Sequence, residues 1–218
     1  MLGRFLRAAH YAGLLIQIGG PRAFITQLRR QFYSRSIFFG LEKDLDSKRV
    51  PISSLLPYSW RKASDKDIDE LLVKAKTESK ESAHELLKRK WFFECGFHDC
   101  YVARTADTGD MCFIGWLLSA KDDILISSGF KGRLPRLNQE EVLLENHYTL
   151  EKYRGNNIFP SVVDKLCGLA KDEGHKRMIA YVRKDNTACL KGLSRLSFGK
   201  FKEISELKLL FFTTKQHN

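Results

Sequence analysis

The sequence has no run of 18 or more apolar residues, so it predicts no helix that spans a membrane. Its first 40 residues lack aspartate and glutamate altogether, although they carry six arginines. Residues 8–20 are apolar and follow two arginines, but the run is short, is broken by polar residues and lacks a convincing cleavage site. A secretory signal peptide is therefore not expected.

Cysteine is sparse, with five residues in the chain. Because the number is odd and no secretory context is evident, we expect reduced thiols in a cytoplasmic protein. Cys95, His98 and Cys100 lie close together in the sequence, but a second ligand pair at the spacing of a structural zinc site is missing. No metal site is expected.

The formal net charge of +11 favours an anionic partner. Because the chain has no Arg/Gly-rich tail and no known nucleic-acid motif, nucleic acid is not the expected partner. Gly19, Gly20 and Pro21 divide residues 1–40 into two predicted helices. Either this helical pair packs on the following domain, or residues 1–35 make a peripheral contact with an anionic membrane.

A strand, a tight turn and a helix are predicted between residues 141 and 173. Residues 141–150 alternate between apolar and polar, which is typical of a half-buried strand. The apolar side holds Val142, Leu144, Tyr148 and Leu150, and the polar side holds Glu141, Glu145, His147 and Thr149. Asn146 and Leu143 interrupt the two sides. From Ile158 the apolar residues recur at helical spacing, with Pro160 in the first turn and Gly174 just past the end.

The turn at residues 152–157 has the properties of an anion-binding site. The first turn of a helix has backbone N–H groups without partners and carries the positive end of the helix dipole. Gly155 allows the backbone to approach a phosphate closely, and Lys152 and Arg154 add positive charge. A pyrophosphate is the ligand that this turn predicts.

The remaining sequence predicts an α/β (α+β) fold with a mixed, mostly antiparallel sheet flanked by helices. Strands are predicted at residues 37–45, from Tyr58, at residues 100–104, 111–119, 124–127 and 178–182, and from Phe198, with a hairpin turn at residues 107–110. Helices are predicted after Ser64 or Asp65, through about Lys90, and after Asn186, which can cap a helix ending near Leu196. We divide the chain into an N-terminal basic, apolar helical extension plus a strand (residues 1–50) and a main domain (residues 51–218).

Two segments together resemble the GNAT superfamily of acyl-CoA-dependent acyltransferases. The turn KYRGNNIF is similar to the acetyl-CoA-binding turn of that superfamily, with Lys152 in the place of Gln or Arg, Gly155 as the central glycine and Asn157 in the place of the last small residue. The segment after Gly174 resembles the second half of a GNAT domain, with Ser197-Phe198 in the place of Gly-Phe. The resemblance implies a GNAT fold over the main domain.

The resemblance also implies where acetyl-CoA, or another acyl-CoA, would bind. Tyr148, Thr149 and Leu150 would lie along pantetheine, and the turn would hold the pyrophosphate. The cofactor-binding residues are therefore expected to be Tyr148, Thr149, Leu150, Lys152, Arg154, Gly155, Asn156, Asn157 and Asn186.

A general base must take the proton of the acceptor amine. Because Glu141, Glu145 and His147 stand two or four residues apart on the polar side of the strand, we expect them to share one face. Several GNAT enzymes place a carboxylate on this strand, so Glu145 is preferred, followed by Glu141 and His147. Many relatives also carry a tyrosine that protonates the departing thiolate, but this chain has Leu193 at that place.

The function expected from the sequence is acetyl transfer to the N or O atom of a small-molecule acceptor. The arrangement looks similar to bacterial GNAT proteins of surface-polysaccharide pathways, which acylate amino sugars. Two alternatives stay open: a degenerate GNAT module that binds CoA or a partner without catalysis, and a long-chain acyltransferase acting at the membrane. The sequence does not indicate the oligomeric state.

Overall fold

The computed structural model describes residue 13 and residues 33–48, 51–129, 134–209 and 212–217. The chain divides into two units: residues 63–96 belong to the smaller one, and residues 36–62 and 97–205 to the larger one. The predicted N-terminal helices, the lipid contact of residues 1–35 and the domain boundary near residue 50 fall almost wholly outside the described ranges. They stay predictions.

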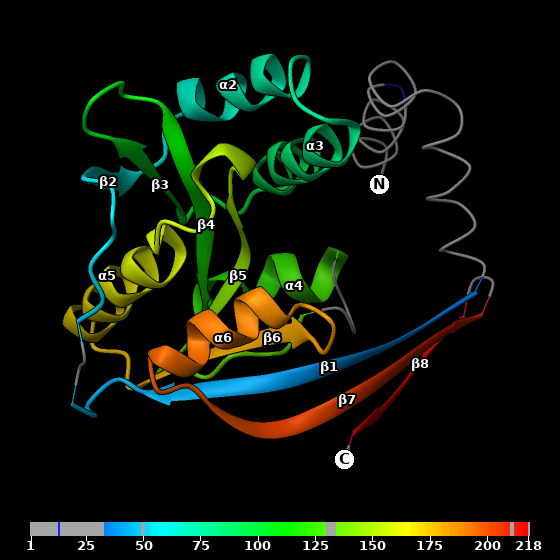
Figure 1. Cartoon of the computed structure of the whole chain (residues 1–218). Coiled ribbons are helices and arrows are strands. Elements are labelled where there is room, and N and C mark those ends of the chain that lie inside the picture. Colours follow the sequence, from blue (N-terminus) through cyan, green and yellow to red (C-terminus); the bar gives the residue numbers. More distant parts are fainter. Residues whose placement is uncertain (1–12, 14–32, 49–50, 130–133, 210–211, 218) are drawn as a thin grey trace. The chain divides into compact units, whose positions relative to one another are not determined.

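One sheet organises the fold, with its strands hydrogen-bonded in the order β2-β3-β4-β5-β6-β1-β7-β8 (Figure 1). The strands are β1 (Tyr33–Asp44), β2 (Tyr58–Lys62), β3 (Cys100–Thr105), β4 (Met111–Ser119), β5 (Glu141–Thr149), β6 (Arg177–Arg183), β7 (Gly199–Leu209) and β8 (Phe212–His217). The pairs β2–β3, β3–β4, β4–β5 and β1–β6 are antiparallel, and β5 pairs with β6 in parallel. The predicted mixed, mostly antiparallel sheet is confirmed.

Two helices of the larger unit follow strands of this sheet. Helix α5 (Ile158–Asp172) connects β5 to β6 and contacts β4 and β5, and α6 (Thr187–Arg195) follows β6 and contacts α5. The Sγ atom of Cys167 on α5 lies 3.6 Å from the Sδ atom of Met178 on β6. We call the side of the sheet that carries Met178 the α5 face, and the opposite side, which carries Arg177 and Glu145, the Glu145 face.

The smaller unit contains α2 (Asp65–Ala75) and α3 (Lys80–Glu94), which pack against each other. Helix α2 begins where predicted, because Ser64 and Asp67 form a capping box in which the Ser64 backbone N–H donates to the Asp67 carboxylate at 2.7 Å. The first turn of α3 is capped by Ser79, whose hydroxyl oxygen accepts a hydrogen bond from the Ser82 N–H at 3.2 Å.

The strand predicted at residues 124–127 is wrong, because these residues belong to α4 (Asp123–Gly129). A 3-10 turn, η1 (Ala120–Asp122), starts directly after β4, with the Ser119 N–H donating to the Asp122 carboxylate at 2.9 Å. The Ser127 hydroxyl then donates to the carbonyl of Ile124. Local capping therefore overrides the β propensity of the two isoleucines, of which Ile124 is largely exposed. None of the described helices is long and apolar enough to cross a bilayer.

Candidate functional site

A bulge in β5 determines where its polar side chains point. In the register with β4, Trp116 lies opposite Glu145 and Ile114 lies opposite Tyr148, so two residues of β5 oppose Gly115. Asn146 takes up the extra residue with a left-handed φ of 51°. Because Ile114 and Trp116 point to the same side, Glu145 and Tyr148 also share a face, although they are three residues apart.

The predicted sides of β5 are correct up to Glu145 and wrong beyond the bulge: His147 does not share the face of Glu141 and Glu145, and Tyr148, predicted on the opposite side, does. The bulge turns the imidazole to the α5 face, where it stacks on the Phe159 ring at 4.7 Å and its Nε2 atom lies 3.2 Å from the Cys189 thiol. A Cβ added to Gly115 would lie 3.1 Å from the His147 Cβ, so these two residues face each other. The signal for the bulge was Asn146, which tolerates left-handed backbone and interrupts the apolar side of the strand.

The parallel pairing of β5 with β6 stops halfway along both strands. The register runs from Glu141 opposite Arg177 to Leu144 opposite Ala180, whereas β5 continues to Thr149 and β6 to Arg183. Residues 145–149 therefore present a β5 edge without a β6 partner. The bulge lies at this point, and a bulge bends the strand that carries it. An open strand edge can pair with the backbone-like amides of a ligand.

Arg177 lies at the end of β5 and β6 where the two strands are still paired. Its guanidinium donates to Glu141 at 2.5 Å and to Glu42 at 2.7 Å, which joins β5, β6 and β1 on the Glu145 face. The second oxygen of Glu141 accepts the backbone N–H of Asn138 at 3.2 Å. The Glu141 carboxylate is thus bound within the fold. Glu145 is the first residue of β5 beyond the region paired with β6.

The predicted phosphate turn has the backbone geometry of an anion site. After the 3-10 turn η2 (Glu151–Tyr153), Gly155 and Asn157 adopt left-handed φ values of 82° and 57° on either side of Asn156. The backbone N–H groups of Gly155, Asn156 and Asn157 donate no hydrogen bond to any residue that the structure describes. Successive N–H groups in such a conformation at the start of a 15-residue helix form a concave site for an anion.

Contacts from outside the turn hold this conformation. The carbonyl oxygen of Asn156 accepts the Leu55 N–H at 2.9 Å and the Ser54 hydroxyl at 3.1 Å. The Asn157 side chain accepts a hydrogen bond from Arg195 of α6 at 2.8 Å. Asn157 stands where the GNAT motif has a small residue. It suits this position because asparagine tolerates left-handed backbone and because Arg195 holds its side chain. Sequence reasoning missed Arg195, Ser54 and Leu55.

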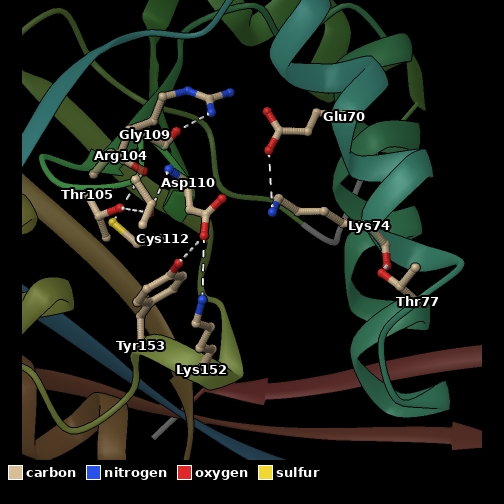
Figure 2. Close-up of polar contacts among 12 residues, drawn as sticks. Glu70, Lys74, Thr77, Arg104, Thr105, Gly109, Asp110, Cys112, Lys152 and Tyr153 are labelled. Carbon is tan, nitrogen blue, oxygen red and sulfur yellow. Dashed lines mark hydrogen bonds and ion pairs between the residues drawn. The ribbon is translucent and has the colours of Figure 1, made fainter.

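Arg154 and Lys152 lie beside the turn. Arg154 Nε donates to the carbonyl of Thr149 at 3.2 Å, and its guanidinium lies 5.3 Å from the centre of the Tyr148 ring. Lys152 and Tyr153 both reach Asp110 at the end of the β3–β4 turn, as Figure 2 shows. The Tyr153 hydroxyl donates to Asp110 at 2.7 Å, and the ammonium of Lys152 lies 3.5 Å from the same oxygen. Asp110 therefore ties the phosphate turn to the central hairpin.

Tyr153→Phe should weaken the phosphate turn. The phenol is a reliable donor, because burial and the hydrogen bond to Asp110 raise its pKa. Removing this bond should cost about 1 kcal/mol of stability and lower the affinity for CoA several-fold. Thermal unfolding and calorimetric titration with CoA would measure both. Asp110→Asn keeps an acceptor for Tyr153 and should have the smaller effect; equal CoA affinities of Tyr153→Phe and the unchanged chain would contradict this role.

Helix α6 begins near the place where β5 and β6 separate, and Asn186 is its N-cap, as predicted. The Asn186 side chain accepts the Cys189 N–H at 3.2 Å. Burial raises the pKa of the Cys189 thiol to about 12, so this cysteine stays protonated and is not a nucleophile activated by His147. Leu193 is fully buried, so α6 offers no hydroxyl at the place where many GNAT enzymes have a tyrosine.

No protein-family model matches the sequence, and no curated protein matches it. Solved structures do match. A region described as a GCN5-related glucosamine N-acetyltransferase, in a fungal multi-domain GH3 beta-N-acetylglucosaminidase, is 15% identical over 85% of this chain and 22% of its own, with a TM-score of 0.56. A GCN5-related N-acetyltransferase from Sphaerobacter thermophilus is 9% identical over 91% of this chain and 57% of its own, with a TM-score of 0.52.

A GNAT-family acetyltransferase from Colwellia psychrerythraea is 11% identical over 81% of this chain and 57% of its own, with a TM-score of 0.51. This chain thus spans less than two thirds of the length of each of these three proteins. At such low identity the likeness concerns the fold, and it confirms the predicted one. The chain has the GNAT fold.

Proposed function

We propose, on the basis of the GNAT fold and the open edge of β5, that this protein is an acyl-CoA-dependent N- (or O-) acyltransferase. The observation that carries the proposal is that the parallel pairing ends at Leu144 and Ala180, and that the unpaired end of β5 leads into a turn with the backbone geometry of an anion site. One ligand could use both the unpaired strand edge and the helix N-terminus. A pantetheine arm with a pyrophosphate at its end needs both.

The described residues fit an acyl-CoA, with acetyl-CoA as the proposed donor. The edge formed by Tyr148, Thr149 and Leu150 would bind pantetheine, and the N–H groups of residues 155–157 would bind the pyrophosphate. Lys152 and Arg154 would add charge at the turn, and Asn186 caps the helix beside the opening. When bound, the thioester supplies the activated acyl group.

The residues of the chain that act on the acceptor are proposed as follows. Glu145 takes the proton of the acceptor amine, directly or through a water molecule. Glu141 is assigned a structural role, because Arg177 and the Asn138 N–H already bind its two oxygens. His147 is assigned a packing role on the α5 face. Since Leu193 provides no acid, the CoA thiolate would leave without a protein donor at that place.

For the acceptor we propose a small-molecule amine, with an amino sugar as the leading class. The support is the fungal region described as a glucosamine N-acetyltransferase, which has a similar fold, together with the resemblance of the sequence arrangement to GNAT proteins of surface-polysaccharide pathways. We further propose a cytoplasmic location, consistent with five unbridged cysteines, and a peripheral contact of residues 1–35 with anionic membrane. That contact would also suit a long-chain acyl donor.

A two-part experiment tests the function. Mass spectrometry of the purified native protein should detect bound CoA, and calorimetry should give an affinity for added CoA. Release of free thiol from acetyl-CoA should then rise on addition of amino sugars and sugar nucleotides, but not of their N-acetylated forms. No binding of any acyl-CoA would refute the proposal.

The second candidate function is a module that binds CoA without catalysis. The buried Leu193 favours it, because a residue that often assists the leaving thiolate is replaced by a core side chain. Tight CoA binding without thiol release on any amine, at any pH up to the acceptor pKa, would support the module. Thiol release with longer acyl donors alone would support the membrane-related alternative.

A further inference from the structure

An aromatic and cationic cluster lies on β6, β1 and β7, next to the open edge of β5. The rings of Tyr181 and Phe201 meet edge to face with centroids 6.3 Å apart. The ammonium of Lys202 lies 4.9 Å from the centre of the Tyr181 ring and 5.2 Å from that of Phe201. A Cβ on Gly40 would come within 2.7 Å of the Lys202 stem and 3.0 Å of the Phe201 ring, so the bare backbone of β1 makes room for both.

The cluster is on the same face as the proposed base. Glu141 and Arg177 are paired and form an ion pair, so both point to the Glu145 face. Four residues further along each strand, Glu145 and Tyr181 point to that face as well and are the first two residues beyond the last pair. Both residues thus stand at the point where the two strands cease to pair, on the same face of the sheet.

The positively charged side chains in and beside the cluster differ in whether a carboxylate binds them. Arg177, which lies 4.8 Å from the centre of the Phe201 ring, is bound by the carboxylates of Glu42 and Glu141. Lys200, two residues before Lys202 on β7, pairs with Glu203 at 2.7 Å and lies over Phe39, which points to the α5 face and so away from this cluster. Lys202 pairs with no carboxylate in the described part of the chain. Its ammonium is therefore the charge of this cluster that can bind an anion.

We infer that the acceptor is an amine on a ring that also carries an anionic group, such as an amino-sugar phosphate. This inference rests on the proposed acyl-transfer function. The amine is placed at Glu145, the ring lies against Tyr181, and the anionic group pairs with Lys202. Half-buried aromatic rings provide a flat surface for the apolar face of a sugar, and a lysine above them attracts an anion. The three groups of the ligand thus lie in the order of the strands that contact them, with the amine at β5, the ring at β6 and the anionic group at β7.

A comparison of phosphorylated and unphosphorylated acceptors tests this inference. We expect kcat/KM with acetyl-CoA to be at least tenfold higher for glucosamine 6-phosphate or glucosamine 1-phosphate than for glucosamine. In Lys202→Met, which keeps the stem but removes the charge, this ratio should fall towards one, and Lys202→Arg should restore it. Lys200→Met is the matched control, because Lys200 is already paired with Glu203, and it should leave the ratio as it is. A ratio that is near one in the unchanged chain overturns the inference.

A binding measurement separates this inference from the proposed function. Calorimetric titration with glucosamine 6-phosphate, glucosamine and inorganic phosphate needs no turnover. Binding of the sugar phosphate that weakens about tenfold in Lys202→Met supports the inference even if no acyl transfer is found. Binding that is equal in Lys202→Met, or equal for inorganic phosphate alone, overturns it while leaving the acyltransferase proposal in place.

Discussion

Replacing Glu145 with glutamine should lower the rate of acyl transfer by about two to four orders of magnitude, the usual contribution of a general base. Glutamine keeps the shape of the side chain but cannot accept a proton. The affinity for CoA should stay close to that of the unchanged chain, because backbone groups of the turn and of the strand edge are the proposed contacts. Thiol release under saturating acyl-CoA and acceptor would measure the first effect, and calorimetry the second.

The structure supplies two controls for this prediction. Glu141→Gln removes a carboxylate from the same face and strand, but one that is bound by Arg177, so it should reduce stability more than turnover. His147→Ala removes a side chain on the opposite face and opens a space beside Phe159. If Glu145→Gln keeps most of its activity while Glu141→Gln loses it, the base has been assigned to the wrong carboxylate.

The pH profile provides a further check. A general base matters less once the acceptor amine is already neutral, so the rate deficit of Glu145→Gln should shrink as pH rises towards the pKa of that amine. A deficit that stays constant from neutral pH upwards would indicate that Glu145 orients the acceptor and does not take its proton. A deficit that shrinks equally in Glu141→Gln would point to a shared role of the two carboxylates.

The sequence predicted the scaffold of the site well because local signals agree there. The alternation before residue 150, the glycine turn and the helical spacing after Ile158 each favour one structure, and all three elements are found at nearly the predicted bounds. The capping residues Ser64 and Asn186 were also correct, since a side-chain cap is a contact over three residues. Such signals need no knowledge of the rest of the fold.

The faces of β5 beyond Asn146 could not be predicted, because they depend on the register with a strand 30 residues away. A single extra residue at Asn146 moves His147 to the α5 face and leaves Glu145 on the other. The same limit applies to Tyr181, Phe201 and Lys202, which meet only because β1 brings Gly40 between β6 and β7. Contacts across strands that are distant in the sequence leave no periodic pattern.

The supports of the phosphate turn also come from distant segments. Arg195 holds Asn157 across 38 residues, and Ser54 holds Asn156 across 102 residues. A turn that is fixed from several sides loses little conformational entropy when an anion binds, which favours affinity. The departures from the known motif at Lys152 and Asn157 are therefore compatible with binding, because the backbone geometry that matters is kept by other residues.

Gly155→Glu should lower the affinity for CoA by about a hundredfold or more. A carboxylate within about 4 Å of a bound phosphate opposes it by several kcal/mol at a surface-like dielectric, and a factor of 100 corresponds to about 2.7 kcal/mol. The Cβ itself would meet no neighbour within 4 Å, so steric crowding inside the protein is not the cause. Calorimetric titration of the variant with CoA measures the effect.

Gly174→Glu is the matched control, because it separates the ligand effect from backbone strain. Gly174 also has a left-handed φ, of 89°, and open space at its Cβ position, but it lies past the other end of α5. A non-glycine residue at either place should cost about 1–2 kcal/mol of stability, so the two variants should melt at similarly lowered temperatures. Only Gly155→Glu should then lose CoA, since anions are attracted to the N-terminus of a helix and not to its C-terminus. Equal CoA affinities for the two variants would show that the turn at Gly155 does not hold the pyrophosphate.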